Sequence, residues 1–207
     1  MESTQLYIIT PPAFNVNDFA GQLTEALAGG PVASVQLRLK DASDAEIIVA
    51  AKVLMPVCHE REVAFIINDR PDIAREVGAD GVHVGQDDMS YAQAREIVGE
   101  RCIVGVTAKN SRHLSMIAAE QGADYVAFGA FFPTDTKAGT VTAELSLISW
   151  WAELFETPCV AIGGITVDNA SPLIEAGADF LAVCGGIWDY DQGPKAAVQK
   201  FNDLFKA

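Results

Sequence analysis

Polar and apolar side chains alternate in one short run near the start of the chain. In Val35–Lys40, single leucines separate Gln36, Arg38 and Lys40. Residues two apart share one face of a β-strand, so the three polar side chains would point one way and the leucines the other. Arg38 can donate to an anion in bidentate fashion and Lys40 adds a point charge, which predicts a clamp for an anionic substrate. The alternative is an internal salt-bridge network, for example with Asp69.

Acidic residues stand at the ends of two later apolar runs. Asp69 ends one run, and Asp87 and Asp88 follow another that contains His83. Mg²⁺ typically takes one or two carboxylates and completes its shell with phosphate oxygens and water. Asp69 and Asp88 beside a basic clamp therefore predict a Mg²⁺ site, with Asp87 in reserve; the alternative is that Asp87 or Asp88 only caps the following helix. For His83, the alternative to substrate contact is a core histidine whose hydrogen bonds are satisfied.

A polar stretch at 134–140 combines hydroxyl groups, a lysine and a glycine. It contains Thr134, Thr136 and Lys137. This composition suits a phosphate-binding lid, and an ordinary polar surface loop is the alternative.

Two glycine pairs stand at the ends of the last two apolar runs. They are Gly163-Gly164 and Gly185-Gly186. Glycine lets backbone N–H groups approach phosphate oxygens closely, and a helix N-terminus adds positive potential. The pairs therefore predict a second anion site, with tight packing or a turn as the alternative.

Eight apolar runs alternate with longer amphipathic stretches. The candidate strands are Leu6–Thr10, Ser34–Lys40, Ala64–Asp69, Gly81–Gly85, Cys102–Ala108, Tyr125–Phe132, Cys159–Ile165 and Phe180–Gly185. The candidate helices include Asp44–Arg61, Tyr91–Gly99, Arg112–Gly122, Leu145–Phe155 and Pro194–Phe205. Near-continuous apolar runs are typical of parallel strands buried on both faces. Spread over residues 1–207, the eight units average about 26 residues, which predicts one α/β domain, a single (β/α)₈ barrel; a doubly wound open sheet is the alternative.

Three junctions between a candidate helix and the next strand repeat the phrase Gly-Ala-Asp. They lie at 78–80, 122–124 and 177–179. The glycine suits a left-handed helix end, and the next strand is expected to begin directly after the aspartate.

In such a barrel, chemistry belongs at the C-terminal ends of the strands. The basic clamp and the acids would lie there on one side, and the glycine pairs across from them. Two anion sites suit an enzyme that joins or separates two phosphorylated molecules, one of which carries a diphosphate.

The charge balance excludes several classes of partner. Fourteen Lys and Arg stand against 28 Asp and Glu, for a formal net charge of −14. A surface that acidic repels nucleic acid and anionic lipid, so phosphorylated small molecules are the expected partners; the sequence leaves a homo-oligomer open.

No apolar run is long enough to span a membrane, and the first residues do not form a signal peptide. Four widely spaced cysteines without a CxxC pair favour reduced thiols in the cytoplasm.

As a set, these residues resemble those of the thiamine-phosphate synthase family. The matching motifs are Gln36-Leu37-Arg38-x-Lys40, Asn68-Asp69-Arg70, the stretch from Gly78 to Asp88, Gly105-Val106-Thr107, the stretch from Gly122 to Lys137, and Ala161-Ile162-Gly163-Gly164-Ile165. The resemblance implies a (β/α)₈ barrel that joins hydroxymethylpyrimidine diphosphate to thiazole phosphate with Mg²⁺. The products would be thiamine phosphate and pyrophosphate, with the pyrophosphate leaving before the thiazole nitrogen attacks.

The resemblance also implies a role for each matching residue. Arg38, Lys40, Asn68 and Lys137 would hold the diphosphate, and Asp69 and Asp88 would hold Mg²⁺. Thr107 stands where the family has a serine beside the leaving pyrophosphate. Gln36 and His83 would line the pyrimidine pocket. Thr134, Thr136 and the Gly163-Gly164 backbone would hold the thiazole phosphate.

The chain differs from the family pattern at a few positions. Leu39 replaces an acid, Lys109 stands where many relatives have histidine, and Cys184-Gly185 stands where a serine is usual. Two alternatives follow: an isomerase similar to thiazole tautomerase, and a non-catalytic paralogue that binds a phosphorylated heterocycle. The isomerase branch tends to lose the metal-binding acids, so Asp69 and Asp88 favour the synthase.

Overall fold

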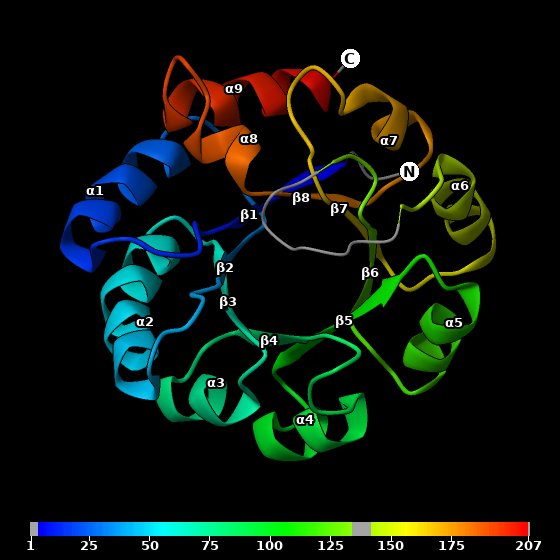
Figure 1. Ribbon diagram of the computed structural model, residues 1–207, viewed down its shortest axis with the longest axis horizontal. Coiled ribbons are helices and arrows are strands. Elements are labelled where there is room, and N and C mark those ends of the chain that lie inside the picture. The colour runs from blue at the N-terminus through cyan, green and yellow to red at the C-terminus, as the bar shows by residue number, and fades with distance from the viewer. Residues whose placement is uncertain (1–3, 134–141, 207) are drawn as a thin grey trace.

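The computed structural model describes residues 4–133 and 142–206, and it confirms the predicted barrel. Eight parallel strands close on themselves, each paired with its neighbours in chain order and β1 paired with β8. The strands are β1 (Gln5–Ile9), β2 (Ser34–Leu37), β3 (Ala64–Asn68), β4 (Gly81–Val84), β5 (Ile103–Lys109), β6 (Tyr125–Gly129), β7 (Cys159–Ile162) and β8 (Phe180–Val183). Figure 1 looks down the barrel, with the strands inside and the helices around them.

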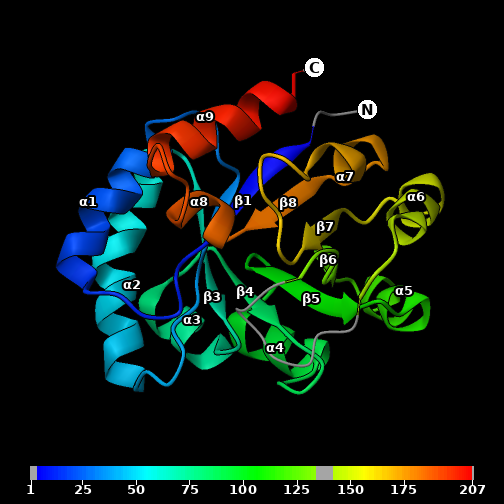
Figure 2. The same ribbon diagram turned by 45° about the horizontal axis from the view of Figure 1, so that its top comes forward.

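The helices are α1 (Val16–Leu27), α2 (Asp44–His59), α3 (Pro71–Val77), α4 (Tyr91–Val98), α5 (Arg112–Glu120), α6 (Leu145–Leu154), α7 (Ser171–Glu175), α8 (Gly185–Trp188) and α9 (Pro194–Leu204). The five helices whose bounds were predicted, α2, α4, α5, α6 and α9, match those bounds to within two residues. Helix α1 packs against both α2 and α9, which closes the outer ring. Figure 2 shows the short α8 as an extra turn between β8 and α9. In the described part of the chain, no helix is long and apolar enough to cross a membrane.

Alternate residues of each strand divide the buried side chains into two layers. One layer, between strands and helices, includes Leu6, Ile8, Phe65 and Phe128. The other fills the barrel interior with Tyr7, Ile9, Ile66, Tyr125, Ala127, Val160 and Ala182. The period of two therefore determines which residues can reach the barrel mouth.

The repeated Gly-Ala-Asp phrase is one turn built three times. Gly78, Gly122 and Gly177 all have positive φ, and a strand begins directly after each aspartate, as predicted. Each aspartate also accepts a hydrogen bond at 2.7 Å from a backbone N–H of the preceding strand. The three donor and acceptor pairs are Phe65 with Asp80, Val104 with Asp124, and Cys159 with Asp179. The turn thus ties the start of one strand to its neighbour.

Strand β2 is shorter than the predicted Ser34–Lys40 and ends at Leu37. Beyond that point the backbone N–H of Arg38 donates to Thr10 Oγ1 at 3.0 Å, and that of Lys40 donates to Pro12 O at 2.8 Å. The chain therefore leaves the sheet to follow the loop after β1. The strand alternation consequently reaches Arg38 at most, and strand geometry does not determine the direction of the Lys40 side chain.

Candidate active site

Asp69 lies at the barrel mouth, one residue beyond the end of β3. Its φ is +60°, in the left-handed region that Asp and Asn adopt more readily than other side chains. Its backbone N–H donates to His83 O at 2.7 Å, and Asn68 Nδ2 donates to its carboxylate at 2.6 Å. These contacts from β3 and β4 hold the carboxylate at the end of the two strands.

Asp88 folds back toward β4, because its Oδ2 accepts the backbone N–H of Gly85 at 2.9 Å. A Cβ at Gly85 would lie 2.7 Å from that oxygen, so only glycine leaves room for the carboxylate. Helix α4 is capped by Ser90, whose side chain forms a capping box with Gln93. Asp88 is therefore not the helix cap. Asp87 faces Lys109 instead, with 3.6 Å between Oδ2 and Nζ.

The carboxyl groups of Asp69 and Asp88 interact directly. Burial and, after it, the negative charge of Asp88 raise the pKa of Asp69 to about 6, although the hydrogen bond from Asn68 and the charge of Arg38 lower it. Two neighbouring carboxylates form an oxygen donor set of the kind that hard divalent cations prefer. Within the described ranges, no group of three or more His, Cys, Asp or Glu side chains is arranged to hold a metal ion.

Arg38 is half-buried at the end of β2 and carries a positive charge into the mouth. This charge lowers the pKa of Asp69 and also that of Cys184, whose pKa burial raises to about 11. Arg38 therefore acts on residues at the ends of both β3 and β8. Among the described residues, no ion pair includes Arg38 or the exposed Lys40, which disfavours the internal salt-bridge alternative.

A chain of hydrogen bonds crosses the barrel interior below the mouth. Two of its residues, Tyr7 and Tyr125, were not predicted from the sequence as part of the site. Gln36 Nε2 donates to the Tyr7 hydroxyl at 2.7 Å, and the hydroxyls of Tyr7 and Tyr125 lie 2.9 Å apart. The Tyr125 hydroxyl is 2.9 Å from His83 Nδ1, and His83 Nε2 is 2.7 Å from Thr107 Oγ1. We call these five residues the interior relay.

The relay depends on a glycine in β5. A Cβ at Gly105 would lie 1.9 Å from the ring of Tyr125, so this side chain crosses the barrel only because position 105 has none. The His83 ring stacks on that of Tyr125 at 5.6 Å between centroids. Burial raises the pKa of Tyr7 to about 12 and holds that of Tyr125 well above its usual value, so both phenols stay protonated. The strand alternation could have identified the tyrosines, because it places both in the barrel interior. Tyr7 shares the inward face of β1 with Ile9, two residues later, and Tyr125 pairs with Gly105, which leaves room for its ring.

The glycines after β7 and β8 lie in close backbone contacts. An ideal Cβ would lie 2.3 Å from Ala130 Cβ at Gly163, 2.3 Å from Pro133 O at Gly164, and 2.4 Å from Ile165 O at Gly186. Packing alone thus accounts for glycine at these three positions. At Gly185 the nearest atom is a carboxylate oxygen of Asp189, 2.9 Å from the ideal Cβ. Thr134, Thr136 and Lys137 lie outside the described residues.

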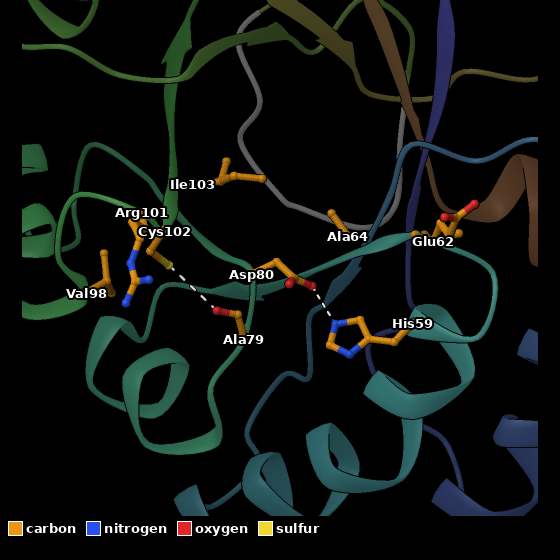
Figure 3. Close-up of a pocket in the computed structure, with 10 residues that line it drawn as sticks. His59, Glu62, Ala64, Ala79, Asp80, Val98, Arg101, Cys102 and Ile103 are labelled. Carbon is orange, nitrogen blue, oxygen red and sulfur yellow. Dashed lines mark hydrogen bonds and ion pairs between the residues drawn. The ribbon is translucent and has the colours of Figure 1, made fainter.

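A hollow lies at the opposite end of the barrel, where the strands begin. It has a volume of about 750 Å³ and is lined by residues that precede or begin β3, β4 and β5. Figure 3 shows the pair of His59 and Asp80 on its wall, 2.8 Å apart, with Cys102 beyond Ala79. None of the predicted site residues lines this hollow, because all of those described lie in the C-terminal half of a strand or beyond its C-terminal end.

Known proteins resemble the chain along its sequence and in three dimensions. The sequence profile of the family described as thiamine monophosphate synthase matches residues 6–187. A thiamine-phosphate synthase from Rhodospirillum centenum is 58% identical over 206 residues, which is 100% of both chains. The structure of thiamine phosphate pyrophosphorylase from Pyrococcus furiosus has a TM-score of 0.85 at 32% identity, and the match covers 98% of this chain and 95% of that one.

The barrel alone would not identify the family. Orotidine 5'-phosphate decarboxylase from Pyrococcus horikoshii matches 97% of this chain and 99% of its own with a TM-score of 0.70, yet only 15% of the residues are identical, so it shares the fold and no more. The similarity along the sequence distinguishes the two cases, because it extends over the acids, the arginine and the strands that carry them. The chain therefore belongs to the thiamine monophosphate synthase family, whose members are transferases.

Proposed function

We propose that this protein joins hydroxymethylpyrimidine diphosphate to thiazole phosphate and releases thiamine phosphate and pyrophosphate, with Mg²⁺ as the metal. The observation that carries the proposal is the pair of carboxylates, Asp69 and Asp88, close to Arg38, which forms no ion pair with any other described residue. A diphosphate and a divalent cation would complete both halves of this arrangement. The family to which the chain belongs supports the choice of reaction.

In this proposal the diphosphate lies between the cationic and the acidic residues. Asp69 and Asp88 would hold Mg²⁺, which when bound would neutralise negative charge on the leaving pyrophosphate. Arg38 would donate to phosphate oxygens, and Lys40, Asn68 and Lys137 would add donors around them. The reaction then needs no protein nucleophile, because stabilising the leaving group is electrostatic catalysis.

The pyrimidine would sit over the interior relay. Gln36 and His83 belong to the relay and are both almost fully buried, so they offer polar groups at the floor of the mouth. Thr107 is half-buried at the same level and would face the leaving group. The second phosphate would lie across the barrel, near Gly163, Gly164, Gly185 and Gly186, with Thr134 and Thr136 as further donors.

The test is product formation by the purified protein. We expect thiamine phosphate from the two substrates and Mg²⁺, and no product after a chelator has removed the metal. Asp69→Asn should abolish the metal-dependent turnover, whereas Asp87→Asn, one residue before the second ligand, should retain it. Conversion of the thiazole phosphate alone, unaffected by chelator, would favour the isomerase, and binding without turnover would favour the non-catalytic paralogue.

A further inference from the structure

The protons of the interior relay can be assigned by counting donors and acceptors. Gln36 presents Nε2, which only donates, to the Tyr7 hydroxyl, so the Tyr7 oxygen accepts at that contact. Each neutral phenol has a single proton to donate. The remaining question is whether Tyr7 donates to Tyr125 or Tyr125 donates to Tyr7.

Only one direction uses every proton. In the part of the chain that the structure describes, the Tyr7 hydroxyl contacts Gln36 Nε2 and the Tyr125 hydroxyl alone, and the residue is 3% exposed. If Tyr125 donated to Tyr7, the Tyr7 proton would be buried without an acceptor, which is unfavourable. If Tyr7 donates to Tyr125, the Tyr125 proton goes to His83 Nδ1 at 2.9 Å and nothing is left unsatisfied.

We infer that the relay runs one way, from Gln36 through Tyr7, Tyr125 and His83 to Thr107, and that it holds His83 as the tautomer with its proton on Nε2. His83 then donates to Thr107 Oγ1, so the proton of the Thr107 hydroxyl is directed to a ligand at the mouth. Tyr7 and Tyr125 are positioning residues, because they act on Thr107 through His83. The tautomer does not depend on the reaction; only the identity of the ligand, a diphosphate oxygen, rests on the proposed function.

The direction of the relay depends on the amide at its start. Gln36→Glu at a pH where the new side chain is ionised replaces a donor with a group that only accepts. Tyr7 would then donate to Glu, Tyr125 to Tyr7, and His83 to Tyr125 from Nδ1. The substitution should therefore move the His83 proton from Nε2 to Nδ1, although three hydrogen bonds separate the two side chains.

The tautomer can be read without substrate from a ¹⁵N–¹H correlation spectrum of protein labelled at its three histidines, with His83→Gln to assign the signal. We expect Nε2–H in the wild type and Nδ1–H in Gln36→Glu. Adding Tyr7→Phe to Gln36→Glu cuts the relay and should restore Nε2–H, because the Tyr125 proton then has only His83 to bind. Tyr91→Phe, which removes a hydroxyl that donates to Gly122 O at 2.8 Å, should change nothing.

Three results would overturn the inference: Nδ1–H in the wild type, Nε2–H in an ionised Gln36→Glu, or Nδ1–H persisting in the double variant. If Gln36→Glu does not fold, the wild-type spectrum alone still tests the tautomer of His83. The direction of the Thr107 hydroxyl has its own test with Mg²⁺ and inorganic pyrophosphate. Thr107→Val should weaken pyrophosphate binding about tenfold in the wild type and have no effect in Gln36→Glu, where Thr107 donates to His83. Equal losses in both backgrounds would refute it, and neither readout requires turnover.

Discussion

Asp69→Asn should stabilise the metal-free protein while removing its metal-dependent activity. At neutral pH the Asp69 carboxylate is ionised at a cost, because it is partly buried and lies against Asp88. Asparagine is neutral, keeps an oxygen that can accept from Asn68 Nδ2, and tolerates the positive φ at this position. The substitution therefore removes the charge with little change of shape.

The size of the effect follows from the pKa. A pKa of about 6 instead of 3.8 corresponds to about 3 kcal/mol against the ionised form. Asp69 is only partly buried, so water screens the charge and we expect about 1 kcal/mol of stabilisation. In a chain of this length that amounts to about 2–4 °C in Tm.

The pH dependence has a definite sign. Below pH 3.8 the carboxyl group is protonated in both states, so the wild type and Asp69→Asn should be equally stable. Between pH 3.8 and about 6 the unfolded chain loses this proton and the folded chain keeps it, so the wild type loses stability relative to the variant. Above pH 6 the full difference should remain.

The assay is thermal unfolding of both proteins with chelator, and again with Mg²⁺ and pyrophosphate. A ligand at about 100 times its Kd adds about 2.7 kcal/mol to the protein that binds it, so the order of the two Tm values should reverse. Two results would refute this reasoning. The variant could be less stable than the wild type in chelator at pH 7, or its Tm could rise as much as that of the wild type when Mg²⁺ and pyrophosphate are added.

The remaining predictions concern the clamp, the relay and the turns. Arg38→Gln should raise the KM for the diphosphate substrate or lower kcat. Because the Arg38 charge lowers the pKa of Asp69, the variant should also lose Mg²⁺ binding at a higher pH than the wild type as the solution is acidified. An Mg²⁺ titration at pH 6 that matches the wild type would contradict this. Gly105→Ala should lower the free energy of unfolding in urea by about 3 kcal/mol or more, because the new methyl group would overlap the Tyr125 ring. Its control is Gly21→Ala, whose Cβ would have no atom within 4 Å and which should stabilise the protein by about 0.5–1 kcal/mol. Asp124→Ala should lower stability by about 1–3 kcal/mol because it leaves the N–H of Val104 without its partner and removes one of several acceptors of Arg95. Equilibrium unfolding that matches the wild type would show that the turn is dispensable.

The pattern of apolar runs predicted the barrel because each unit has a strong period of its own. Strands β4, β6 and β8 begin where Gly-Ala-Asp indicates, because the phrase contains both the glycine with positive φ and the aspartate that ends the turn. The ends of the strands were less predictable. Strand β2 stops at Leu37 because Arg38 and Lys40 bond to the loop after β1, and no local signal in 34–40 contains that information.

The same distinction holds for the site. Asp69 and Asp88 were predictable from their type and position, and the structure brings them together. The sequence named Asp88 first and left open that it only caps the helix; the structure places Ser90 at the cap and Lys109 opposite Asp87. Tyr7 and Tyr125 escaped notice because each looks like an ordinary core aromatic until the barrel closes and places their hydroxyls 2.9 Å apart.

The three Gly-Ala-Asp turns and the proposed binding residues lie at opposite ends of the barrel. Their aspartates fasten neighbouring strands at the end where the strands begin, far from the acids and the arginine. Leu39, Lys109 and Gly185, where the sequence differs from the expected family pattern, all lie at or beyond the other end of a strand. Substitutions there change what the mouth binds without loosening the fastened end. A laboratory that wished to redirect this barrel to a different pair of phosphorylated substrates could therefore randomise the loops after the strands and leave every aspartate turn untouched.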